Sequence, residues 1–240
     1  MPETLEDFLM KQSPTAERPL LGQTIMIVED SRYASDALRI ICQKCGARIR
    51  RADTLASAER HLRMYRPGIA LIDVGLPDGS GLELVRHLAT GEPRIGVIMV
   101  MSGDDAFAPE AALEAGANGF IAKPIQSIQT FTKLILSELP ADARPIELRP
   151  VGEDSVTPDT MGLRDDLALA AELLQPGPDA QTLDYVTNFL IGVSRSADDT
   201  PLQCAVRDVE TARGAGGAAA AEVADLKDLI DARLSEASGV

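Results

Sequence analysis

The sequence predicts an α/β fold with a doubly wound, five-stranded parallel sheet, followed by a small all-α domain. Three observations support this prediction. Short apolar or β-rich runs alternate with segments of helical spacing as far as residue 138. Prolines then gather at positions 140, 145, 150 and 158, and beyond them only helical spacing recurs. Two of the runs lack any alternation, which is typical of strands that helices cover on both faces.

The strands of the predicted sheet follow from short runs of β-forming residues. TIMIV opens the sheet, ARIRR alternates between two faces, and IALID, IGVIMVM and GFIA are apolar runs. These segments occupy residues 24–28, 47–51, 69–73, 95–101 and 119–122. Parallel neighbours need long crossovers, and these are right-handed almost without exception. A helix is therefore expected between successive strands.

The predicted helices have apolar residues at helical spacing and recognisable ends. Thr54 is suited to cap the second helix. Pro109 lies near the start of the fourth, and Gly116 is suited to end it. The five segments span residues 31–45, 54–64, 80–89, 109–116 and 127–138.

The remaining chain predicts a second, all-helical domain. Apolar residues recur at helical spacing over 163–174, 186–193, 202–209 and 223–234, with a flexible Gly-rich joint at 214–217. The predicted organisation is a flexible N-terminal tail, an α/β domain, a Pro-rich linker and a helical domain. Their bounds are 1–21, 22–139, 140–160 and 161–237.

Composition excludes several classes of protein. The 240 residues carry a net charge of −14, which disfavours binding to a phosphate backbone. No apolar run is long enough for a bilayer and the N-terminus lacks a signal-peptide core, so we expect a cytoplasmic protein. Three cysteines do not make a disulfide framework. Cys42 and Cys45 are interpreted as small apolar residues, with a metal or redox role as the alternative.

Polar side chains follow four of the predicted strands at their carboxyl ends. Glu29 and Asp30 follow the first strand, and Asp73 ends the third. Ser102 follows the fourth strand and Lys123 the fifth. Ligands of doubly wound sheets bind at this edge. Three neighbouring acids repel one another, and a hard cation such as Mg²⁺ relieves that repulsion.

These residues lie within motifs that resemble a known family. The motifs are VEDS (28–31), LIDVGLPDGSGLEL (71–84), VMSGDD (100–105) and GFIAKP (119–124). With them, residues 22–138 resemble the receiver domain of a bacterial two-component response regulator, which has a flavodoxin-like fold. The resemblance covers about half of the chain.

The resemblance implies a role for each acid at the strand ends. Asp73 would accept a phosphoryl group from a sensor histidine kinase or a phosphotransfer protein. Mg²⁺ would be held by Glu29, Asp30, Asp73 and the backbone carbonyl of Gly75. Asp30 would be a direct ligand, and Glu29 would bind directly or through water. Glutamate at the first acid position is a mild departure from the family pattern.

The other matched residues would handle the phosphoryl group or respond to it. Lys123 would pair with Asp73 before transfer and with the phosphoryl group afterwards, and its bond to Pro124 is expected to be cis. Ser102 would donate its hydroxyl to a phosphoryl oxygen and be drawn inward. Phe120 occupies the position of an aromatic switch residue. It could act through packing alone, and a plain core phenylalanine is the alternative.

The sequence says less about the function of the second, helical domain. From residue 145 onward seven Arg and Lys stand against 18 Asp and Glu, which disfavours DNA binding. No histidine lies beyond residue 140, which excludes a phosphotransfer histidine there. An acidic domain with leucine-rich helix faces suits a downstream protein partner or a homodimer. Those faces could equally form only the domain's own core.

Two alternatives for the output stay open at this stage. One is a transcription factor with an acidic helix-turn-helix. The other is an enzymatic effector, for instance with a crevice around Asp165, Asp166 and Asp198. Without such a site, no enzymatic activity is expected beyond Mg²⁺-dependent self-phosphorylation and autodephosphorylation of Asp73.

Overall fold

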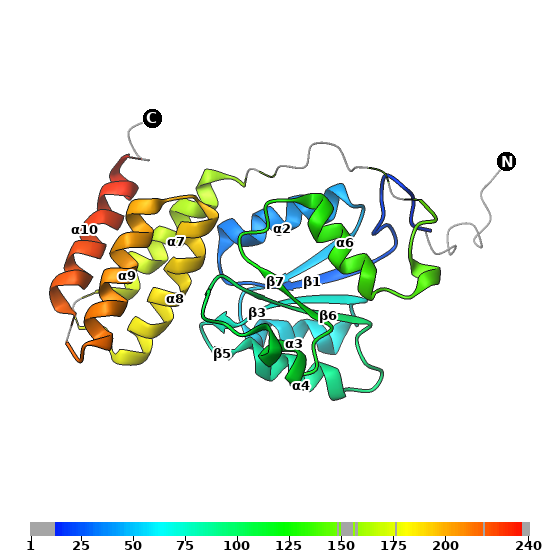
Figure 1. The fold of residues 1–240 in the computed structure, drawn as a ribbon, viewed down its shortest axis with the longest axis horizontal. Coiled ribbons are helices and arrows are strands. Elements are labelled where there is room, and N and C mark those ends of the chain that lie inside the picture. The colour runs from blue at the N-terminus through cyan, green and yellow to red at the C-terminus, as the bar shows by residue number, and fades with distance from the viewer. Residues whose placement is uncertain are drawn as a thin grey trace.

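The structure is a computed structural model that describes residues 13–147, 149, 156, 158–175, 177–217 and 219–236. A sheet flanked by helices lies beside a bundle of four helices (Figure 1). This arrangement confirms the predicted fold class. The two parts are called here the sheet domain and the helical bundle.

Five parallel strands form the central sheet. They are β1 (Thr24–Val28), β2 (Arg48–Ala52), β3 (Ile69–Asp73), β6 (Val97–Ser102) and β7 (Gly119–Ala122). Their order across the sheet is β2-β1-β3-β6-β7, and each neighbouring pair is parallel. All five residues of β3 are buried, as its uninterrupted apolar run predicts.

Helices cover both faces of this sheet. They are α2 (Arg32–Lys44), α3 (Leu55–Met64), α4 (Gly81–Thr90), α5 (Pro109–Glu114) and α6 (Ile128–Glu138). Alternate side chains of β1 and β3 enter two cores: Ile27 and Leu71 pack with α2 and α6, while Met26 and Ala70 pack with α3, α4 and α5. Burial on both faces is why the middle positions of these strands, Ile25–Ile27 and Ala70–Ile72, are all apolar.

Most element bounds agree with the predicted ranges to within two residues. Thr54 caps α3 as predicted, since its hydroxyl accepts a hydrogen bond from the Ser57 N–H at 3.1 Å. The structure adds a short hairpin, β4 (Gly75–Leu76) with β5 (Gly79–Ser80), and one 3-10 turn, η1 (Ala141–Ala143). Two-residue strands carry no periodicity, so sequence patterns do not reveal them.

The sheet domain begins earlier than residue 22. Leu20 is fully buried in the core under α2, and its N–H donates to the Cys45 carbonyl at 2.9 Å. The predicted tail therefore contributes at least one core residue. The rest of that tail up to residue 12 lies outside the described residues, as do 148, 150–155 and 157 of the predicted linker. Val156, within the linker, packs against the same core.

The helical bundle consists of four helices. They are α7 (Thr160–Leu173), α8 (Ala180–Ser196), α9 (Thr200–Gly214) and α10 (Ala220–Glu236). Asp159, Asp179 and Asp199 cap the first three by accepting from backbone N–H groups. The predicted apolar stripes form one shared core that includes Leu167, Leu190 and Val206. The stripes are thus largely used within the bundle itself.

The bundle stands at the carboxyl edge of the sheet. Helices α7 and α8 contact α2, and α8 also contacts β4, while α10 lies on the far side of the bundle (Figure 1). Within the part of the chain that the structure describes, no helix has the length and apolar character needed to cross a membrane.

Candidate functional site

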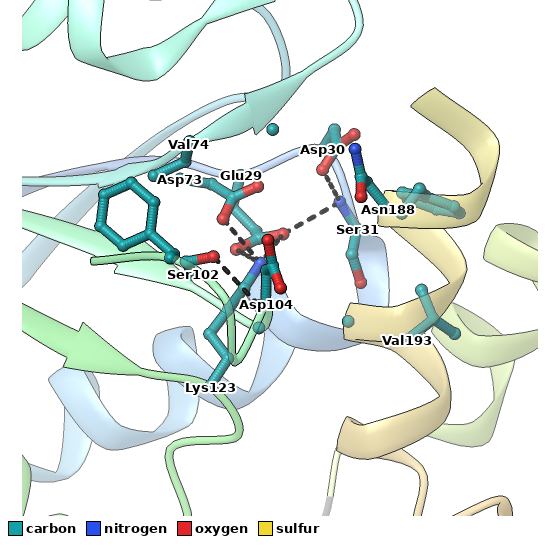
Figure 2. A pocket seen from close by; sticks show the side chains of 15 residues that line it. Glu29, Asp30, Ser31, Asp73, Val74, Ser102, Asp104, Lys123, Asn188 and Val193 are labelled. Carbon is teal, nitrogen blue, oxygen red and sulfur yellow. Dashed lines mark hydrogen bonds and ion pairs between the residues drawn. The ribbon is translucent and has the colours of Figure 1, made fainter. Parts of the chain in front are cut away.

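Strand register brings the predicted polar residues to one place. Val28 pairs with Ile72, Asp73 with Met101, and Ser102 with Ala122, so the strands end at a common edge. A cavity of about 100 Å³ opens there. Its lining includes all the residues predicted for metal binding and phosphoryl transfer: Glu29, Asp30, Asp73, Gly75, Ser102 and Lys123. Figure 2 shows these side chains, apart from the glycine, directed toward one another.

The loop after β3 holds the Asp73 backbone in place. The Val74 N–H donates to the Met101 carbonyl at 3.1 Å, which continues the sheet ladder by one residue. At Gly81 a Cβ atom would lie 1.8 Å from the Asp73 carbonyl oxygen, so only glycine fits there. The Asp78 carboxylate accepts from the Leu55 N–H at 2.8 Å and so ties the loop to the start of α3. The Pro/Gly-rich sequence after β3 thus produces a rigid support for one carboxylate.

Lys123 is the cationic centre of the cavity. Its Nζ lies 2.9 Å from Asp73 Oδ1 and 3.0 Å from Glu29 Oε2, and its side chain is only 9% exposed. Burial alone lowers the pKa of Lys123, but the Asp73 and Glu29 carboxylates outweigh burial and raise it above its usual value. Lys123 is therefore fully protonated, and its bond to Pro124 is cis as expected.

Three carboxyl groups, those of Glu29, Asp30 and Asp73, share the cavity with the single ammonium group of Lys123. Burial raises the pKa of Glu29 to about 8, against the opposing attraction of Lys123. Burial and the Asp73 charge raise the pKa of Asp30 to about 7. One oxygen from each of Glu29, Asp30 and Asp73 lies within 4.8 Å of the others. The arrangement disfavours three simultaneous negative charges without a further cation.

The donor set fits Mg²⁺. Hard divalent cations prefer carboxylate and carbonyl oxygens, and the three acids present such oxygens at one cavity wall. Gly75, expected to supply a backbone carbonyl, lines the same cavity. Within the described residues this is the one group of three acidic, histidine or cysteine side chains close enough to hold an ion.

Ser102 and Phe120 have different relations to the cavity. Ser102 is buried at the cavity, and its hydroxyl accepts from the Asp104 N–H at 3.1 Å. Phe120 does not line the cavity but stacks on Phe107, which does, with ring centroids 5.3 Å apart. A movement of Phe120 would therefore reach the cavity through Phe107.

Helix α8 supplies cavity residues that the sequence did not single out. Asn188, Phe189, Gly192 and Val193 line the cavity, and Figure 2 shows Asn188 and Val193 on the helix beside the acids. The Tyr185 hydroxyl, one turn before them, donates to Asp30 Oδ2 at 2.7 Å. These residues lie more than 60 positions from the nearest strand-end motif, and no spacing rule connects the two. Only the docking of the bundle reveals them.

Other sequence candidates lie elsewhere. Cys42 and Cys45 are buried in the core of the sheet domain, where burial raises the pKa of both thiols. This location favours the structural interpretation of the C-x-x-C pair. The acidic crevice considered around Asp165, Asp166 and Asp198 is not formed, because Asp166 is buried against α2 whereas Asp198 is exposed after α8.

Comparisons with known proteins agree with this geometry. Residues 25–135 match the sequence model of the response regulator receiver domain. The KDP operon transcriptional regulatory protein KdpE of Escherichia coli K12 is 30% identical over 123 residues, which are 50% of this chain and 54% of KdpE. The virulence transcriptional regulatory protein PhoP of Shigella flexneri is 24% identical over 110 residues, 46% of this chain and 49% of PhoP. This chain thus spans about half the length of these curated relatives.

A solved structure of similar sequence is that of a putative response regulator from Chloroflexus aurantiacus J-10-fl. It is 26% identical, and the match covers 48% of this chain and 96% of that chain with a TM-score of 0.45. The family model stops at residue 135 and leaves the helical bundle unassigned.

Proposed function

We propose that the chain is a phosphorylation-controlled switch in a two-component system, because residues 25–135 match the sequence model of the response regulator receiver domain. Asp73 accepts a phosphoryl group from a sensor histidine kinase or a phosphotransfer protein, and the helical bundle passes the change to a protein partner. The observation that carries this proposal is the contact of buried Lys123 with both Asp73 and Glu29, at 2.9 and 3.0 Å, inside one acidic cavity.

The transfer step follows from the side chains at the cavity. An Asp73 carboxylate oxygen attacks the phosphorus of a phosphohistidine, an O–P bond forms, the N–P bond breaks, and the imidazole leaves with the electron pair. Mg²⁺, when bound by Glu29, Asp30 and Asp73 with the Gly75 carbonyl, supplies positive charge that neutralises the phosphoryl oxygens. Lys123 then exchanges its contact with the carboxylate for one with the phosphoryl group.

Ser102 and Phe120 would convert this step into a conformational change. The Ser102 hydroxyl moves toward a phosphoryl oxygen and donates its hydrogen to it, while its oxygen accepts from the Asp104 N–H, at 3.1 Å before phosphorylation. That movement shifts the loop after β6 and, through Phe107, the ring of Phe120. The result is a shift between two conformations of the sheet domain, expected to act in the cytoplasm.

DNA binding by the bundle is the second candidate, since KdpE and PhoP are named transcriptional regulatory proteins. The acidic balance of residues 145–240 argues against it, because a duplex would repel this half of the chain. Retention of the full chain on heparin at low salt, with elution at raised salt, would favour DNA binding. Flow-through would favour the protein-partner proposal.

Phosphate incorporation tests the proposed function directly. Wild-type protein and an Asp73→Asn variant are incubated with radiolabelled acetyl phosphate, with Mg²⁺ or with EDTA. We expect label only in the wild type with Mg²⁺, and we expect it to be acid-stable and sensitive to hydroxylamine, as an acyl phosphate is. Equal labelling of the two proteins would reject Asp73 as the acceptor.

A further inference from the structure

The cavity that holds Asp73 is covered by the chain's own helical bundle. Asn188, Phe189, Gly192 and Val193 of α8 line this cavity, and Figure 2 shows α8 beside the acids. We propose that the bundle occupies, within the same molecule, the surface on which a phosphoryl donor must dock, so that donor and bundle exclude each other. This inference rests on the proposed function, since it concerns access to the same aspartate.

The first contact that holds the bundle is to a predicted metal ligand. Tyr185 donates its hydroxyl to Asp30 Oδ2 at 2.7 Å, while Oδ1 accepts from the Ser31 N–H at 2.9 Å. Both carboxylate oxygens of Asp30 therefore have a protein donor. The Tyr185 ring stacks on Phe189, which itself lines the cavity. A metal ion or a phosphoryl donor that binds Asp30 must therefore compete with the Tyr185 hydroxyl of α8.

The second contact is a buried carboxylate at the start of α2. Asp166 of α7 is 1% exposed and accepts from the Ser31 hydroxyl at 2.7 Å and the Arg32 and Tyr33 N–H groups at 2.8 and 3.0 Å. A helix N-terminus attracts negative charge, so this carboxylate satisfies donors that α2 cannot satisfy itself. All three of these donors belong to the sheet domain, so the buried Asp166 carboxylate fastens α7 to the start of α2.

The third contact is to the loop that carries Ser102. Arg195 of α8 donates to the Gly103 carbonyl and forms a two-pronged pair with the Asp105 carboxylate. Close by, a Cβ atom added to Gly103 would lie 3.1 Å from the Gly192 Cα. Two glycines thus let the backbone of α8 approach this loop closely. Arg195 of α8 therefore contacts the same loop that is expected to move on phosphorylation.

These contacts also indicate the kind of donor that fits. The surface around the cavity accepts one face of α8, with Tyr185, Asn188, Gly192 and Arg195 at helical spacing, and the start of α7 beside it. A donor that presents a phosphohistidine on a helix paired with a second helix would use the same surface. A cavity of about 100 Å³ closed by α8 leaves no room for such a helix while the bundle is docked.

The test weakens the docking without touching the phosphoryl-transfer residues. The open variant is the full chain with Asp166→Ala and Arg195→Ala. The matched control carries Asp231→Ala and Arg213→Ala, which remove a pair with Lys227 and a pair with Asp184, both inside the bundle and away from the sheet domain. Tyr185→Phe is a milder third variant, because it removes one hydroxyl and keeps the ring. Two readouts are taken: amide hydrogen exchange over residues 29–36 and 102–105, and the rate at which Asp73 is labelled by acetyl phosphate with Mg²⁺.

We expect the open variant to exchange faster in both segments and to be labelled at least about tenfold faster than wild type, since access scales with the undocked fraction. The control should remain within about twofold of the wild type, because exposed ion pairs contribute little. Tyr185→Phe should lie between them.

Three outcomes would overturn the inference. Faster exchange with equal labelling rates would show that the bundle does not limit access. Unchanged exchange and unchanged labelling in the open variant would show that these contacts do not hold the bundle. Absence of label in every protein, including one whose segments exchange freely, would reject the proposed function itself and with it this inference.

Discussion

The sheet domain and the helical bundle use charge in opposite ways. In the sheet domain, Glu29, Asp30 and Asp73 are drawn together around a single lysine, and burial raises the pKa of Glu29 to about 8. In the bundle, acids sit at helix ends, where Asp159, Asp179 and Asp199 cap three helices. The clustered carboxyl groups lower the stability of the sheet domain and supply the groups of the proposed phosphoryl transfer, whereas the capping aspartates only stabilise the ends of their helices.

This difference predicts how substitutions should rank. Changes at the sheet edge should have large effects that depend on pH and Mg²⁺. Changes in the bundle that lie away from its contacts with the sheet domain should have smaller effects that depend on neither pH nor Mg²⁺.

The largest effect is expected from Lys123→Met, which removes the cation and keeps the side-chain length. Buried carboxylates then lack a partner, so we expect a loss of about 3–5 kcal/mol in the free energy of unfolding at pH 8 in EDTA. The loss should shrink at pH 5.5, where the acids take up protons. Urea unfolding of both proteins at the two pH values measures it.

Lys133→Met on the exposed face of α6 is the matched control, with an expected change below about 0.5 kcal/mol. A similar loss in both variants would contradict the charge argument.

Gly81→Ala should be the next most damaging, because its Cβ would lie 1.8 Å from the Asp73 carbonyl oxygen. Relief of that overlap must move the backbone of Asp73, so we expect about 3 kcal/mol of destabilisation together with slower labelling of Asp73. Thermal denaturation and acetyl phosphate labelling measure the two effects. Gly214→Ala, where a Cβ would meet nothing within 4 Å, is the control in the bundle. The prediction is wrong if the two variants unfold at the same temperature.

Mg²⁺ should stabilise the protein more at high pH than at low pH. The folded-state pKa values of Glu29 and Asp30, about 8 and about 7, lie above their unfolded values of 4.5 and 3.8. Without Mg²⁺, the stability that these groups contribute below their unfolded pKa values is lost as the pH rises toward 8. Because Mg²⁺ binds the ionised acids, its stabilisation should grow over that range, to about 2.7 kcal/mol at a hundredfold excess over Kd.

Melting temperatures in Mg²⁺ and in EDTA, taken from pH 5.5 to pH 8, measure this coupling. In the Glu29→Gln variant, the difference between the melting temperatures in Mg²⁺ and in EDTA should change less with pH. A Mg²⁺ effect that is the same at every pH would contradict the assignment of these acids to the ion.

The smallest effect is expected in the bundle. Asp199→Ala removes the cap of α9 and the partner of Arg233, whose Nε lies 3.0 Å from Asp199 Oδ2. We expect a loss of about 1 kcal/mol, unchanged by Mg²⁺. Urea unfolding with and without Mg²⁺ measures it, and a Mg²⁺-dependent loss would mean that the two regions are less distinct than proposed.

The sequence predicted most of the sheet domain because its signals are local. Apolar runs between helical segments determined the strands, and motifs at four strand ends placed Glu29, Asp30, Asp73, Ser102 and Lys123 at one edge. The structure brings all five to one cavity. The four helices of the bundle were also predicted, since each carries a periodic apolar stripe.

The identity of each helix and strand and the acidic edge of the sheet therefore follow from the sequence alone, because spacing along one strand or helix sets which side chains share a face. Three features became visible only in the folded molecule: Leu20 joins the core, Asp166 caps α2, and Tyr185 donates to Asp30. Each of these depends on how separate segments dock. Docking is governed by shape and by buried hydrogen bonds between residues far apart in the chain, which no local pattern records.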